Sequence, residues 1–208
     1  MSRSHWPQLL LLAGFTAVFT GYLTVWLAGP SAGLSFIGVE IGEWIKFMGM
    51  GPRRNWFYLP PVSLGLMLAV WTVGWPNSRW QTWLMRAVAV AVCLLSFPAL
   101  EDLTGHFSHE YTPRVWAIGL VVVVAGVSGL IDRGSQAVRL KWLAIALLAL
   151  IGYVLPVWVY WQARTAVSTV VGLPVGSGLG IWLNGFGCTA ATLAALKQFF
   201  DPKIEIRD

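Results

Sequence analysis

The sequence predicts an all-α membrane protein, a polytopic transmembrane helical bundle with about six spans and a short helix in the outer interface. Of the 208 residues, 57% are hydrophobic and 11% are charged, whereas a soluble domain carries about 25% charged residues. A soluble core of this size could not hide so much apolar surface, but lipid tails can replace a core. We therefore expect residues 1–208 to form a single membrane domain.

Six apolar segments approach the roughly 20 residues that a helix needs to cross a bilayer. Their runs are continuously apolar, which is typical of helices and not of a transmembrane barrel. The first segment is too long for a signal peptide, whose apolar region has about 7–15 residues, and is predicted to stay in the protein as a helix. Arg86 is close to the start of the third segment and is expected to reach the headgroups. The expected spans are 8–29, 57–76, 81–101, 114–131, 139–161 and 176–200.

The basic residues predict the orientation. With a cytoplasmic N-terminus, nine lysines and arginines fall inside and five fall outside, so the positive-inside rule places both termini in the cytoplasm, in a plasma (inner) membrane. The net charge of +5 does not indicate nucleic-acid binding, because the basic residues are scattered and no recognition motif accompanies them. The five outer residues are Lys46, Arg53, Arg54, Arg114 and Arg164.

The segment 34–48 has apolar residues at helical spacing and is predicted to be the interfacial helix. Its acids, Glu40 and Glu43, either face water on a helix that lies flat on the lipid, or line a cavity. Arg53 and Arg54 follow closely. They either pair with these two acids or bind an anionic headgroup or solute, since a guanidinium suits phosphate and carboxylate.

The loop between the third and fourth segments gathers carboxylates and imidazoles within ten residues. Asp102, His106, His109 and Glu110 are residue types that divalent metals prefer and that transfer protons near neutral pH. Gly105 disfavours a regular helix here, and the pattern is not HExxH. A solvated loop is the first interpretation, a metal or catalytic site is the second, and partner binding or pH sensing is the third.

A glycine-rich stretch precedes the last segment. Gly176 and Gly180 form a small-xxx-small pair that would allow close helix packing. Asn184 is polar at depth and must find a hydrogen-bond partner. This face serves packing within the bundle, an oligomer interface, or a bound pigment, quinone or lipid. Cys93 and Cys188 are expected to be buried small hydrophobes.

Three functions follow from these features, in order of preference. The first is a non-enzymatic structural or accessory subunit that contacts other membrane subunits or itself. The second is a transporter or channel for a small or lipid-like solute, with Glu40, Glu43, Arg53 and Arg54 at an outer vestibule. The third is a metal-dependent enzyme that uses the 101–110 loop. No cofactor is identified, and the candidates are a divalent metal and a bound lipid.

Overall fold

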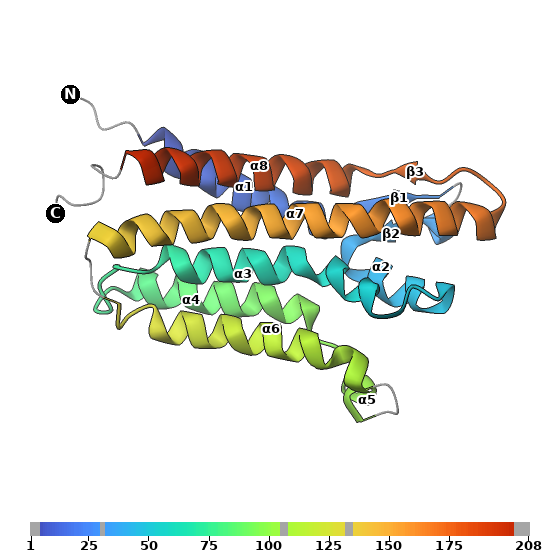
Figure 1. Cartoon of the computed structure of the whole chain (residues 1–208), viewed down its shortest axis with the longest axis horizontal. Coiled ribbons are helices and arrows are strands. Elements are labelled where there is room, and N and C mark those ends of the chain that lie inside the picture. Colours follow the sequence, from blue (N-terminus) through green and yellow to red (C-terminus); the bar gives the residue numbers. More distant parts are fainter. Residues whose placement is uncertain (1–4, 30–31, 105–107, 132–134, 202–208) are drawn as a thin grey trace.

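The molecule is a bundle of helices that lie side by side along its long axis (Figure 1). The computed structural model describes residues 5–29, 32–104, 108–131 and 135–201, and 81% of these residues are helical. The predicted helical character is therefore confirmed. The longer helices of this described part are α1 (Trp6–Tyr22), α3 (Leu59–Trp71), α4 (Trp80–Cys93), α6 (Ser108–Val127), α7 (Ser135–Val171) and α8 (Leu179–Phe200).

These helices alternate in direction, so α1 begins and α8 ends at the same end of the bundle (Figure 1). We call this the terminal end. The opposite end, which we call the loop end, carries two short helices, α2 (Gly38–Trp44) and α5 (Leu100–Thr104), and a small sheet. The bundle is thus asymmetric, because the small sheet and these two short helices all lie at the loop end.

Three helices within the described residues are long and apolar enough to cross a membrane: His109–Val127, Gln136–Val171 and Leu179–Phe200. The helices α1, α3 and α4 are shorter, with 17, 13 and 14 residues. The 37-residue α7 is the longest, and Pro156 lies inside it. These helices are compatible with a membrane protein.

The outer surface of α7 is an apolar stripe. Its exposed side chains recur every three or four residues, which places them on one face of the helix. A soluble monomer rarely exposes a continuous apolar patch of more than a few hundred Å², whereas lipid covers such a surface without cost. The stripe consists of Leu140, Leu143, Leu147, Leu150, Val154, Trp158 and Trp161.

Two expected spans differ from the observed helices in ways that matter for the loop end. The helix expected over 8–29 stops at Tyr22 and is followed by a strand. The helix expected over 81–101 ends with a 3₁₀ turn at Ser96, and Phe97 is extended with ψ 127°. The cause is Pro98, because a residue that precedes proline is pushed out of the helical region.

The sheet is a departure from the all-α expectation. Strands β1 (Val25–Ala28), β2 (Phe36–Ile37) and β3 (Gly176–Ser177) are antiparallel in the order β2-β1-β3. Gly176 was expected to lie on the same helix as Gly180. It pairs instead with Ala28 in the sheet. The ladder supplies backbone partners to the residues after α1, so this stretch does not need a helix to satisfy its amides.

The segment expected as one interfacial helix, 34–48, is also more complex. It contains β2, then α2, then the 3₁₀ helix η2 (Ile45–Met48), which ends at Gly49 with φ 70°. Ile41 and Ile45 are fully buried beneath it, while Trp44 and Phe47 are exposed. The helix therefore anchors the loop end to the bundle through its aliphatic side.

Two buried cations meet the last turn of α3 at the terminal end. Arg86 was expected to reach the headgroups, but it is buried in the bundle and only 4% exposed. Its Nε donates to Thr72 Oγ1 at 3.2 Å. Lys141 donates to the Val73 carbonyl at 3.4 Å. The carbonyl end of a helix carries partial negative charge, which favours a cation beside it. Thr72 also contacts Ser128 of the turn after α6 at 3.1 Å between hydroxyl oxygens.

Helices α1 and α8 approach closely because glycines line their contact. A Cβ on Gly14 would lie 2.8 Å from the Gly187 carbonyl oxygen, and a Cβ on Gly21 would lie 2.7 Å from the Asn184 nitrogen. Gly180 faces the same contact, since its Cβ would lie 2.6 Å from the Gly21 oxygen. The small residues thus hold the first and last helices together by backbone contact.

We predict that Gly14→Leu destabilises the protein by about 1–3 kcal/mol or more, because the new side chain meets backbone atoms that cannot move aside. The measurement is thermal unfolding in mild detergent. Gly119→Leu is the matched control, since a Cβ at Gly119 on α6 meets nothing within 4 Å. Equal melting temperatures for the two variants would contradict the close packing of α1 on α8.

Candidate functional site

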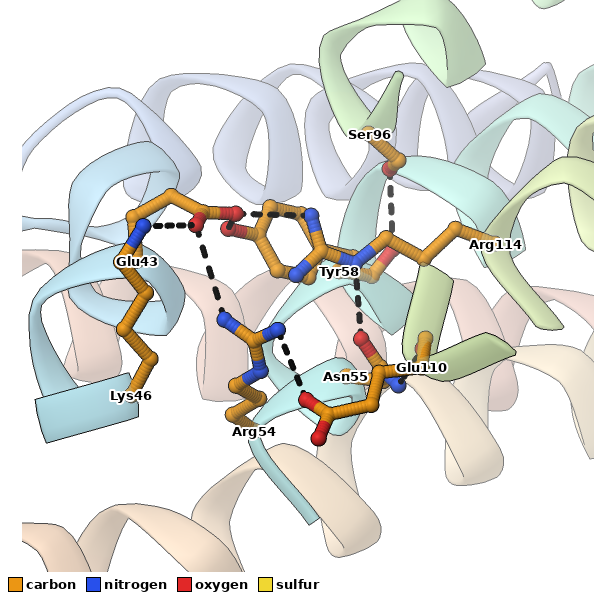
Figure 2. Close-up of polar contacts among 8 residues, drawn as sticks. All are labelled: Glu43, Lys46, Arg54, Asn55, Tyr58, Ser96, Glu110 and Arg114. Atoms are coloured by element: carbon orange, nitrogen blue, oxygen red, sulfur yellow. Dashed lines mark hydrogen bonds and ion pairs between the residues drawn. The ribbon is translucent and has the colours of Figure 1, made fainter. Parts of the chain in front are cut away.

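The loop end contains a cluster of paired charges and hydroxyls, which we call the polar cluster (Figure 2). Its members come from three stretches of chain: α2, the 3₁₀ helix η3 (Gly51–Tyr58), and the first turns of α6. The side chains of these stretches point toward one another in Figure 2. The cluster consists of Glu43, Arg54, Asn55, Tyr58, Glu110 and Arg114.

Glu43 and Arg114 form the central ion pair. Arg114 Nη1 donates to Glu43 Oε1 at 2.9 Å, and the Tyr58 hydroxyl donates to the same oxygen at 2.7 Å. Arg114 is 3% exposed, and its guanidinium lies over the Tyr58 ring at 3.5 Å from the centroid. The planar guanidinium suits this position, because it stacks on the ring and still directs its edge at a carboxylate.

Arg54 forms a second link. It is 2% exposed, and its Nη2 donates to Glu110 Oε2 at 3.0 Å. Its Nη1 also lies 3.6 Å from Glu43 Oε2, so the guanidinium lies between two carboxylates (Figure 2). The Tyr111 ring is 4.7 Å from Arg54 and 5.0 Å from Arg114. One aromatic ring therefore contacts both cations.

Asn55 fixes the start of α6 against η3. Its Nδ2 donates to the Glu110 carbonyl at 2.7 Å, and its Oδ1 accepts from Arg114 Nε at 2.8 Å. The Ser96 hydroxyl donates to the Tyr58 carbonyl at 3.1 Å. The guanidinium is still not saturated, since Arg114 Nη2 is buried without a hydrogen-bond partner among the described residues. A buried donor without a partner costs free energy, so this nitrogen can still donate to a group that enters the cluster.

The surroundings of Glu43 keep it ionised. Burial by itself would raise the pKa of the Glu43 carboxyl, but the hydrogen bonds from Tyr58 and Arg114 act in the opposite direction, as do the charges of Arg114 and Arg54. These favourable interactions prevail, so the pKa of Glu43 lies below its ordinary value. Glu43 is thus an anion that holds the cluster together at neutral pH.

Two pockets meet at this cluster. The first, which we call the apolar pocket, has a volume of about 360 Å³ and lies among η3, α3, α6 and α7. The second, which we call the charged pocket, has a volume of about 280 Å³ and lies between α2 and the segment that leads into α5. Both are lined by Tyr58 and Arg114, so the stacked pair forms a boundary common to both.

The linings differ in chemistry. The walls of the apolar pocket include Trp56, Leu59, Val62, Ala117 and Leu155, with Asn55 and Arg114 as its polar groups. The lining of the charged pocket includes two acids and two bases, Glu43, Lys46, Asp102 and Arg114, beside apolar residues of α2 and of the segment before α5. Together the pockets offer an apolar compartment beside a charged one, with a buried cation at their boundary.

The structure brings some of the predicted site residues together and separates others. Glu43 and Arg54 are paired, which is one of the two alternatives predicted for these residues, and Glu110 joins them. Glu40 is exposed, and Arg53 is exposed with its Nη1 3.5 Å from Gln162 Oε1. Neither lines the apolar pocket or the charged pocket.

The predicted metal set is divided. Asp102 lines the charged pocket, His109 is exposed, and Glu110 is paired with Arg54. His106 lies outside the described residues. Across residues 5–29, 32–104, 108–131 and 135–201, no group of three or more histidines, cysteines, aspartates and glutamates is placed to hold a metal ion.

Asn184 lies elsewhere, on the buried face of α8. It is fully buried, and its Nδ2 donates to the Gly152 carbonyl of α7 at 3.4 Å. Its Oδ1 has no hydrogen-bond partner among the described residues, and the residue lines neither pocket. Cys93 and Cys188 are buried free thiols, as the sequence predicted.

Sequence reasoning did not identify Asn55, Tyr58 and Tyr111 as site residues, and it treated Arg114 only as an outer basic residue. One signal was present. Glu110 and Arg114 stand four residues apart at the start of an apolar helix, a spacing that places opposite charges on one face. Their actual partners are distant in sequence, so the pattern shows the face but not the contacts.

Comparisons of the chain with protein-family models, curated proteins and solved structures gave no match.

We predict that Glu43→Gln flattens the dependence of stability on pH. Because the folded pKa is lowered, Glu43 contributes stability above its unfolded pKa of about 4.3, and this is lost as pH falls through the folded pKa. The variant should be less stable than wild type at pH 7 and should lose less on acidification. Melting temperatures between pH 7 and pH 3 test this, with Glu40→Gln on the same helix as the control. Identical profiles for Glu43→Gln and wild type would contradict it.

We also predict that Arg114→Met destabilises the protein by about 1–3 kcal/mol. This is less than the cost of breaking a fully buried pair, because the Glu43 side chain is 36% exposed. The loss arises because Glu43 and Asn55 lose their charged donor. Thermal unfolding is the measurement, and Arg53→Met, at an exposed position, should have little effect. An equally small effect at both positions would remove Arg114 from the centre of the cluster.

Proposed function

We propose that the chain is a multi-pass protein of the plasma (inner) membrane with six spans, α1, α3, α4, α6, α7 and α8. The three long apolar helices and the exposed apolar stripe of α7 support a membrane location. The six helices run together along one axis (Figure 1). Both termini are proposed to be cytoplasmic, which makes the loop end the outer face. This agrees with the excess of basic residues on the terminal side.

We propose further that the function is to bind a lipid-like solute at the outer face, as a transporter does. The observation that carries this is the pair of pockets that meet at Arg114. Ligand sites combine apolar walls with a few polar groups that fix orientation, and the larger pocket falls within the usual range of about 300–1,000 Å³. An acyl chain suits the apolar pocket, and a headgroup suits the charged one.

This proposal agrees with the buried state of Arg114. A cation held at the boundary of an apolar compartment attracts the polar end of an amphiphile and directs its chain into the pocket. The unpartnered Nη2 is a donor that a bound headgroup, or a rearranged Glu43, would satisfy.

The alternative first expected from the glycine run has less support. A subunit interface built on Gly180 would require this residue to face another chain, but it packs against Gly21 and Trp26 of its own chain. Gly176 is taken up in the sheet. These two glycines therefore account for packing within the chain.

We predict that Ala117→Phe weakens binding of dioleoyl phospholipids by about tenfold, because the ring occupies the apolar pocket and removes roughly 1.4 kcal/mol of chain burial. The measurement is native mass spectrometry of delipidated protein titrated with lipid. Gly119→Phe, two residues along α6 in open space, is the matched control and should bind like wild type.

Two results would contradict the proposal. One is a wild-type protein that retains no phospholipid at any concentration of the titration. The other is equal lipid binding by the Ala117→Phe and Gly119→Phe variants, which would place the bound lipid outside the apolar pocket.

A further inference from the structure

We infer that the headgroup taken by the charged pocket is a zwitterion that carries a phosphate and a primary ammonium, with Asp102 as the ammonium acceptor and Lys46 and Arg114 as the phosphate donors. This inference rests on the proposed function and names its substrate class. It starts from the charges that line the pocket.

Two of the four charged side chains around the pocket are committed elsewhere. Glu43 accepts from Arg114 and Tyr58 and is also close to Arg54. Arg114 is held by Glu43 and by Asn55. Their charges largely compensate each other, but Arg114 Nη2 has no hydrogen-bond partner among the described residues and remains a donor to a ligand. The character of the pocket otherwise depends on the remaining pair, Lys46 and Asp102.

Asp102 is a carboxylate available to a ligand. It is half-buried on α5 and lines the pocket, and its side chain makes no hydrogen bond or ion pair with the other described residues. A carboxylate beside a partly enclosed pocket prefers a cationic donor, and a primary ammonium supplies three N–H groups. A purely anionic headgroup would instead meet Asp102 as a like charge.

Lys46 supplies the opposite charge on the other side of the lining. Its Nζ is 3.7 Å from Glu43 Oε2, a long ion pair between side chains that are each 36% exposed. Such a pair is weak, and a lysine side chain is flexible, so the ammonium can turn to a phosphate at little cost. Arg114 adds a buried cation to the lining.

One free acid and one loosely held base facing a single pocket match a ligand that carries both charges. Each charge of the pocket excludes the wrong ligand, because Asp102 disfavours a simple anion while Lys46 and Arg114 disfavour a simple cation. The apolar pocket, which shares Tyr58 and Arg114, then receives the chain of the same molecule. The ligand class is an aminophospholipid.

The test compares dioleoylphosphatidylethanolamine with dioleoylphosphatidylglycerol, which share the phosphate and chains but differ in the ammonium. Titrations followed by native mass spectrometry should give wild-type binding that is about tenfold tighter for the ethanolamine lipid, the effect of one charge-assisted hydrogen bond. Asp102→Asn should abolish the preference, because it weakens binding of the ethanolamine lipid and removes the repulsion of the glycerol lipid. Glu101→Gln, the exposed neighbour on α5, is the matched control and should retain it.

Lys46→Gln is the second variant and should weaken both lipids alike, since both carry the phosphate. Soluble phosphoethanolamine is the third ligand and should bind much more weakly than the lipid, because it leaves the apolar pocket empty. Equally tight binding of phosphoethanolamine would overturn the lipid assignment.

The outcomes separate the two proposals. If both lipids bind equally to wild type, or if Asp102→Asn keeps the preference, the zwitterion inference fails while lipid binding stands. If neither lipid binds, the proposed function fails as well.

Discussion

The ion pair between Glu43 and Arg114 joins parts of the chain that are far apart in sequence. Arg114 stands near the start of α6, and through one guanidinium it contacts α2 at Glu43 and η3 at Asn55 and Tyr58. Moving an arginine to a position that is 3% exposed costs solvation energy, which is offset only by good geometry and several hydrogen bonds. The arrangement of the loop end, and the boundary between its pockets, depends on that compensation.

Buried cations lie at both ends of the bundle. At the terminal end, Arg86 donates to the Thr72 hydroxyl and Lys141 donates to the Val73 carbonyl, both just after α3. At the loop end, the cations meet full carboxylates. The acids there are placed so that Glu43 serves the fold while Asp102 faces a pocket. The two pockets beside these charges are the reason to look for a ligand at the loop end.

The glycine contacts of α1 and α8 position the loop end indirectly. They bring Gly21 beside Gly180, and the Gly21 carbonyl then accepts a hydrogen bond from Trp26 Nε1 at 2.8 Å. Trp26 is fully buried against Phe57 and Tyr160, so the strand after α1 is fixed to η3 and to α7. A continuous set of contacts therefore connects the packing of α1 on α8 with the small sheet and with η3, which carries part of the polar cluster.

The sequence by itself determined the helical class, the apolar composition that indicates a membrane, and the gathering of charged residues between the apolar segments, because these depend on local composition and length. Glu43, Arg54, Asp102 and Glu110 were recognisable as candidates for the same reason. Tertiary structure alone decided that Glu110 pairs with Arg54 and that Arg114 is central. It also decided that 8–29 ends in a strand and that Gly176 lies in a sheet. These outcomes depend on contacts between residues more than 50 positions apart, or on backbone partners supplied by distant strands, and no local pattern of residues encodes such partners.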